Sequence, residues 1–227
     1  DMKIWIKNPL AILAKNSDGG LIVEDKKILE LIPCGKKPSS NYDSIFDASN
    51  HVILPGLINL HHHFYQTLTR GHPQAINKKL FAWLKTLYPI WANLTPNALR
   101  LSTRLALAEL LLSGCTTTSD HHYVFPFGLE NAIDIQMEEA KALGMRVILC
   151  RGSMDLSQKD GGLPPDSVVQ TCDEIIEDSQ RLIKKYHNPH TGAMNQIALA
   201  PCSPFSVSEK LMKESSVLAE KNDVLLH

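Results

Sequence analysis

Short apolar segments separated by turn-forming residues occupy the first 55 positions of the chain. Runs of strand length lie at Lys3–Ile6, Ala11–Ala14, Leu21–Val23, Lys27–Ile32 and His51–Leu54. The segments Asn16-Ser17-Asp18-Gly19-Gly20 and Pro33-Cys34-Gly35 between them are typical of turns. Strands this close together predict a small antiparallel β unit over residues 1–55.

After Gly56 the pattern changes to strands that alternate with amphipathic helices. Strand-like runs are predicted at Leu57–Leu60, Cys115–Ser119, Met145–Cys150, Ile197–Ala200 and Val224–Leu226. Helices are predicted from Thr95 to Gly114, over Asn131–Leu143, over Ser167–Tyr186 with Asp166 as its cap, and from a Ser206–Glu209 capping box to about Lys221. This alternation predicts a parallel sheet with crossover helices.

Two architectures satisfy this alternation, a doubly wound open sheet and a (β/α)8 barrel. A barrel typically needs about 250 residues for itself. Residues 56–227 hold four strand–helix units and the start of a fifth strand. If the fold is a barrel, these residues form about its first half.

Composition and charge exclude several classes of protein. The 227 residues carry 23 basic and 24 acidic side chains, a formal net charge of -1, which is not the footprint of a protein that binds nucleic acid or an acidic membrane surface. No run approaches the ~20 apolar residues of a membrane span, and the N-terminal residues lack the pattern of a secretory signal. Five widely spaced cysteines, an odd number, favour reduced thiols and a cytoplasmic setting.

The candidate chemistry begins with three consecutive histidines after the strand Leu57–Leu60. Alternate side chains of a strand point to the same face, so we expect His61 and His63 to project together and His62 to point away. Two imidazoles at the carboxyl end of a parallel strand are plausible ligands of a divalent metal ion. The alternative is a solvated cluster of polar side chains.

The segment from Leu54 to His63 resembles the signature of the amidohydrolase superfamily, in the branch of metal-dependent deaminases that act on aminated heterocycles. Further segments are similar to the deaminases of oxidised purines, namely residues 61–70, 87–96, 113–121, 161–167 and 200–207. The resemblance extends over essentially the whole chain.

This resemblance implies a (β/α)8 TIM barrel with a small β-sandwich built in part from the N-terminal segment. It implies one divalent metal ion, zinc or alternatively iron, with His61 and His63 as ligands. The family's other ligands and its proton-shuttling Glu would follow His227, which matches the first His of the family's His-x-His-Leu-x-Glu segment. No catalytic acid or base is therefore assigned within these residues, and we expect the chain to be the N-terminal portion of a longer enzyme. The alternative is a product that ends at His227 with an open barrel edge.

The implied reaction is hydrolytic deamination of a small purine-like molecule. Metal-activated hydroxide would attack the amino-bearing ring carbon and convert 8-oxoguanine and water to urate and ammonia. Guanine, isoxanthopterin and triazines are alternative substrates, and a non-catalytic metal-binding half-barrel is an alternative of another class. A homodimer is the assembly that the family suggests, with no nucleic-acid or membrane partner.

Three further residues are candidates for contact with the substrate near the first two strands. Gln66 matches a family position that hydrogen-bonds the purine, although a loop Gln can also be solvated. His121 follows the second strand of the alternating region and either lines the site or pairs with Asp120. Trp83 offers a flat surface for stacking, or else packs in the interior.

The remaining candidates follow the third and fourth strands. Arg151 could bond a substrate carbonyl or pair with a nearby acid. Cys202 and Ser203 could recognise an exocyclic oxygen, or be a buried thiol and a turn residue.

Overall fold

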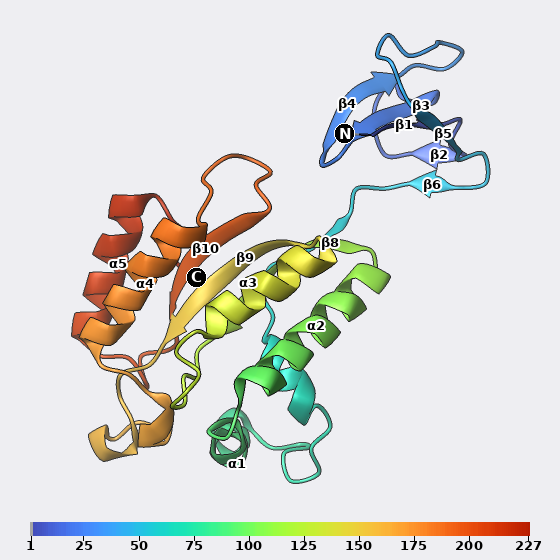
Figure 1. Cartoon of the computed structure of the whole chain (residues 1–227). Coiled ribbons are helices and arrows are strands. Elements are labelled where there is room, and N and C mark those ends of the chain that lie inside the picture. Colours follow the sequence, from blue (N-terminus) through green and yellow to red (C-terminus); the bar gives the residue numbers. More distant parts are fainter. Residues whose placement is uncertain (1) are drawn as a thin grey trace. The chain divides into compact units, whose positions relative to one another are not determined.

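The computed structural model describes residues 2–227, which divide after Gly56 into two compact units (Figure 1). Within the described part of the first unit, all regular elements are strands. The second unit alternates strands and helices, as the sequence predicts. Within the described residues, no helix combines the length and apolarity needed to cross a bilayer.

The first unit is built on a four-stranded sheet in the order β4-β3-β1-β5. Its strands are β1 (Lys3–Lys7), β3 (Gly20–Glu24), β4 (Lys27–Ile32) and β5 (Ser44–Asp47), and β2 (Ala11–Ile12) pairs separately with β6 (Val52–Ile53). Trp5, Ile22 and Ile32 form its buried centre. β1, β3 and β4 are antiparallel as predicted, but β5 pairs in parallel with β1, and β2 with β6. The sequence prediction missed β5 because only Ile45 and Phe46 within it are apolar.

The second unit has a four-stranded parallel sheet in the order β10-β9-β8-β7. Its strands are β7 (Leu57–Asn59), β8 (Cys115–His122), β9 (Arg146–Ser153) and β10 (Asn195–Pro201). The helices are α1 (Leu80–Trp91), α2 (Pro96–Leu112), α3 (Ala132–Leu143), α4 (Cys172–Tyr186) and α5 (Glu209–Asn222). Each strand lies beside the next one in sequence, without the reversal that defines a doubly wound sheet. Leu226 forms a parallel bridge to Leu199 at the β10 edge.

Local signals explain where the helices begin and end. The Thr95 side chain accepts a hydrogen bond from the Ala98 amide at the start of α2, and Gly144 closes α3 in the left-handed conformation. The predicted start of α4 at Ser167 with Asp166 as cap is wrong. Residues 166–168 form a separate 3-10 turn, and the capping box of Thr171 with Glu174 starts α4.

Two other differences concern the helices next to the candidate site. α5 begins at Glu209 with Ser208 as its cap, because the Ser208 hydroxyl accepts from the Leu211 amide. The predicted capping box, which starts at Ser206, therefore begins two residues too early. α1 was not predicted as an element, although Trp83, Tyr88 and Trp91 are spaced as on a helix. This helix brings aromatic side chains to the carboxyl ends of the strands.

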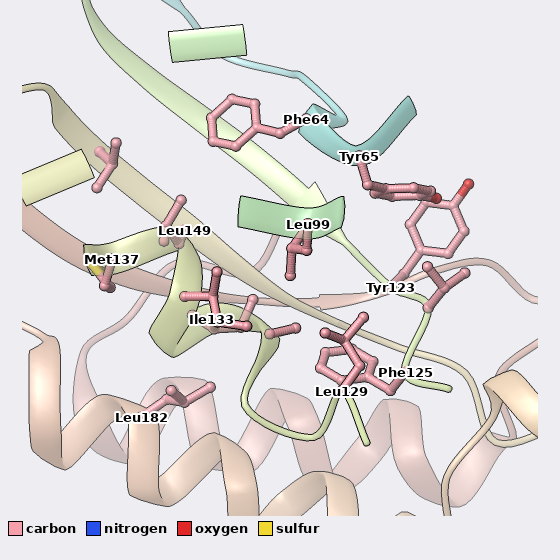
Figure 2. Packing of buried hydrophobic residues seen from close by; sticks show 14 of the residues in the cluster. Phe64, Tyr65, Leu99, Tyr123, Phe125, Leu129, Ile133, Met137, Leu149 and Leu182 are labelled. Atoms are coloured by element: carbon pink, nitrogen blue, oxygen red, sulfur yellow. The ribbon is translucent and has the colours of Figure 1, made fainter. Parts of the chain in front are cut away.

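The main core of the second unit lies between the sheet and its helices. Figure 2 shows Leu99 of α2, Ile133 and Met137 of α3, Leu149 of β9 and Leu182 of α4 gathered in this layer, each almost completely buried. Burial of apolar area is the dominant favourable term in folding, at about 25 cal/mol per Å². The core therefore fixes the carboxyl ends of β8 and β9, where the candidate residues lie.

Candidate metal and substrate site

A cavity of about 320 Å³ opens where the chain leaves β7, β8 and β10. Its volume lies within the range of about 300–1,000 Å³ typical of small-molecule sites. The lining consists of His61, His63, Gln66, Leu80, Phe81, Trp83, Leu84, Tyr88, His121, Tyr123, Leu163, Cys202, Ser203, Phe205 and Ser206. All predicted site residues except Arg151 are therefore brought together at one cavity.

The side chains of His61 and His63 project to the same side of the chain and meet, as the alternation of side chains predicts. Their Nε2 atoms are 3.1 Å apart, and the ring planes are nearly perpendicular. The Nδ1 atom of His63 lies 2.7 Å from the backbone oxygen of His121. A carbonyl oxygen only accepts, so this contact places the proton on Nδ1 and leaves the Nε2 lone pair of His63 free.

The electrostatics of His63 also suit a ligand. Burial lowers the pKa of His63 to about 4. The hydrogen bond to the His121 oxygen raises this pKa, and the neighbouring histidines lower it further. The imidazole is therefore neutral at pH 7, which is the form that binds a metal ion.

This pair fits a divalent ion. Two nitrogens bound at about 2.0–2.1 Å to a tetrahedral ion would lie about 3.3–3.4 Å apart. The separation of 3.1 Å between the two Nε2 atoms is close to that value. His61 and His63 can thus supply two adjacent donors, and a complete site needs further ones.

Two more histidines surround the pair. The Nε2 atom of His227 lies 2.8 Å from Nδ1 of His61, and the two rings stack. His121 packs its ring against that of His63, and its Nε2 lies 3.3 Å from the Ala200 oxygen. Burial lowers the pKa of His121 to about 3. His121 therefore lines the cavity as a neutral side chain and does not pair with Asp120.

Gln66 is oriented by two phenols. Its Nε2 donates to the hydroxyl oxygens of Tyr65, at 3.3 Å, and of Tyr123, at 3.2 Å. Among the residues that the structure describes, its Oε1 has no hydrogen-bond partner and remains an acceptor. Burial raises the pKa of Tyr123 well above its usual range, so the phenol stays protonated. Tyr123 was missed in the sequence, although it lies two residues after His121 and so shares its face.

The opposite wall is formed by the loop after β10 and by α1. Burial raises the pKa of Cys202 to about 11, which keeps its thiol protonated at neutral pH. The hydroxyls of Ser203 and Ser206 lie 2.9 Å apart. Trp83 packs edge-on against Trp91, so it both lines the cavity and contacts the interior.

The structure places Arg151 outside this cavity. Its side chain is almost completely buried, and it donates to Asp178 on α4 at 2.7 Å and to Gln170 at 2.6 Å. The guanidinium also lies 3.8 Å from the ring centre of Phe125. The predicted contact between Arg151 and the substrate is therefore wrong. Arg151 forms the alternative interaction, an ion pair with a nearby acid.

The other two clustered histidines do not line the cavity. The Nε2 of His122 contacts the Val124 oxygen at 2.6 Å in a fully buried position. The His62 ring packs against Phe64. Both placements agree with the alternation that directs their neighbours into the site.

Comparisons with known proteins give one consistent result. The chain is 58% identical to 8-oxoguanine deaminase of Pseudomonas aeruginosa, over 99% of this chain and 51% of that protein. It is 34% identical to an isoxanthopterin deaminase from an unknown prokaryotic organism, over 82% of this chain and 39% of that protein. The crystal structure of atrazine chlorohydrolase from Arthrobacter aurescens TC1, complexed with zinc, matches 100% of this chain and 52% of its own at 28% identity, with a TM-score of 0.86.

The chain spans about half the length of the curated relatives it matches. The family model of the amidohydrolases matches residues 52–227, which include the whole second unit and every residue of the cavity. The chain therefore belongs to the amidohydrolase family.

Proposed function

We propose that residues 57–227 form part of a (β/α)8 hydrolase barrel that removes an amino group from an oxidised purine by hydrolysis. The proposed substrate is 8-oxoguanine, and the products are urate and ammonia. The unreversed strand order supports a barrel, and the identity of 58% to an 8-oxoguanine deaminase supports the substrate.

The observation that carries this proposal is the convergence of the two Nε2 atoms of His61 and His63 at the cavity wall. These two side chains would hold one divalent ion, for which we propose zinc. Such an ion lowers the pKa of water from about 15.7 towards 7 and so makes a strong nucleophile available at neutral pH. The neutral state of His63 supports this role.

The remaining cavity residues would bind and orient the heterocycle. Gln66 Oε1 would accept from a ring N–H, because its amide nitrogen is held by Tyr65 and Tyr123. The Cys202 thiol and the Ser203 hydroxyl would donate to an exocyclic oxygen. Trp83 would cover a flat face of the ring.

Proton transfer needs a group that these residues do not provide. Among the described residues, the cavity lining contains no Asp or Glu. General acid–base catalysis requires a titratable group within hydrogen-bond reach of the leaving amine. We propose that the complete protein supplies a Glu for this step from the sequence that continues the edge beside β10.

The test is a coupled ammonia assay on the complete gene product loaded with zinc. We expect faster release of ammonia from 8-oxoguanine than from guanine, isoxanthopterin or an aminotriazine. Equal or reversed rates would refute the choice of substrate. The absence of ammonia from all four, with zinc bound, would favour a binding module over an enzyme.

A further inference from the structure

Asp120 is a buried carboxylate that faces away from the cavity. It lies on β8 between Ser119 and His121, with no exposed surface, and no cation pairs with it among the described residues. Burying an unpaired carboxylate is costly unless hydrogen bonds compensate for it. The presence of Asp120 at this position therefore calls for a specific role.

Both carboxylate oxygens of Asp120 accept short hydrogen bonds. Oδ1 accepts from the Phe64 backbone amide at 2.6 Å, and Oδ2 accepts from Nε2 of Gln136 at 2.6 Å. Gln136 lies on α3 and is also fully buried. In this arrangement both oxygens of Asp120 accept, and the amide N–H of Gln136 is the donor to Oδ2. The helix thereby fixes the carboxylate, and the carboxylate fixes Phe64.

Phe64 directly follows His63, so its amide belongs to the peptide bond that joins the two residues. β7 ends at Asn59, so the chain that carries both histidines lies beyond its regular strand. β8 holds the first part of this segment through bonds from Ser119 to the Leu60 oxygen and from the His121 amide to the His62 oxygen. The backbone of His63, with φ −133° and ψ 88°, is neither helical nor regularly extended, and the side chain of His63 does not cap the following turn. On the far side of His63, Asp120 accepts from the Phe64 amide. The bonds from the Gln66 amide to the His63 oxygen and from the Thr67 hydroxyl to the Phe64 oxygen lie within the turn that follows, so among the described residues Asp120 is what ties this turn to β8.

We propose that Asp120 is a positioning residue of the metal site. By holding the Phe64 amide, it keeps the His63 backbone where the Nε2 of this side chain meets that of His61. The proposal rests on the proposed role of these two histidines as ligands. Residues behind the ligands of a metal site typically change its affinity by about 10- to 100-fold when they are replaced.

Three variants of the complete protein separate positioning from general destabilisation. Asp120→Ala removes both bonds, whereas Asp120→Asn keeps an oxygen for the Phe64 amide, and Gln136 can rotate its oxygen toward the new N–H. The matched control is Asp134→Ala. Asp134 is another nearly buried acid, on α3, whose partners are Arg181, Lys185 and Tyr186 rather than the site.

The measurements are zinc affinity by competition with a chromophoric chelator, the absorption spectrum of the Co²⁺-loaded protein, and urea unfolding. We expect Asp120→Ala to weaken zinc binding by about 10-fold or more and to alter the Co²⁺ spectrum. Asp120→Asn should restore most of both, and Asp134→Ala should lower stability alone. Wild-type affinity and spectrum in Asp120→Ala, or equal losses of affinity in Asp120→Ala and Asp134→Ala, would overturn the proposal.

Two additional variants keep the test decisive. If Asp120→Ala does not fold, Gln136→Leu releases one carboxylate oxygen with an apolar side chain in place, and unchanged zinc affinity in that variant would contradict the proposed role. His61→Ala tests the ligands themselves. Zinc binding that survives in His61→Ala would refute the ligand assignment. If zinc binding were lost in His61→Ala but kept in Asp120→Ala, only the role of Asp120 would be refuted.

Discussion

Replacing Arg151 by Met should destabilise the fold and leave catalysis nearly unchanged. The guanidinium bonds Asp178 at 2.7 Å and Gln170 at 2.6 Å in a position that is 1% exposed. Removing one partner of a buried ion pair typically costs about 3–5 kcal/mol of unfolding free energy. Asp178 retains a bond from Arg181 at 2.8 Å and is partly accessible to water, so we expect a loss near the lower limit, about 3 kcal/mol.

Urea unfolding of the complete protein measures this loss, and steady-state kinetics on the proposed substrate, 8-oxoguanine, measures the consequence for the proposed reaction. Ser203→Ala is the matched control, because Ser203 lines the cavity and is only half-buried. We expect the opposite pattern for this control, a lower kcat/KM with little change in stability. If Arg151→Met kept wild-type stability and lost kcat/KM by about 10-fold, equivalent to about 1.4 kcal/mol, the reasoning from burial would be wrong.

Three further predictions follow from other contacts. His61→Ala should lose the proposed metal ion and the proposed activity together, whereas His62→Ala should keep the ion, as measured by elemental analysis and ammonia release on the purified complete protein. Gly152→Ala should lower the free energy of unfolding by about 1–3 kcal/mol, because a Cβ there would lie 2.3 Å from the His122 oxygen. Burial opposes ionisation of Asp134, but bonds from Arg181, Lys185 and Tyr186 outweigh it and hold its pKa well below the usual range. Its stabilisation should therefore be fully present above about pH 5 and decline below about pH 4, so urea midpoints of wild type and Asp134→Asn should converge in acid.

Much of the second unit could be predicted because its signals are local. Apolar runs bounded by Gly and by capping residues gave the four strands and the approximate helices. The side-chain alternation gave the shared direction of His61 and His63, which the 3.1 Å contact bears out. Errors arose where two local signals compete, as at the start of α4, where Thr171 with Glu174 is the stronger cap.

The sequence contains a signal for the position of Arg151. Val147 and Leu149 share its parity on β9, and both lie in the core beneath the helices. Cys150 belongs to the other face, where it clusters with Ala198 and Ala200. Parity therefore directs Arg151 toward α4, where Asp178 lies. The identity of its partner could not be predicted, because it depends on how the helix packs.

The alternation of side chains also separates two kinds of polar residue in β8 and directly after it. His121 and Tyr123 face the cavity, whereas Asp120 and His122 face the interior beneath the helices. A polar side chain on the interior face does not reach the cavity, so it affects the site through the groups that it hydrogen-bonds. Asp120 binds the backbone beside a proposed ligand, whereas Arg151 of β9 binds Asp178 on α4. Substitution of the first should therefore alter metal geometry, and substitution of the second should alter stability alone. Two residues on the same interior face thus call for different measurements, and a result that exchanged them would contradict the contacts of these side chains.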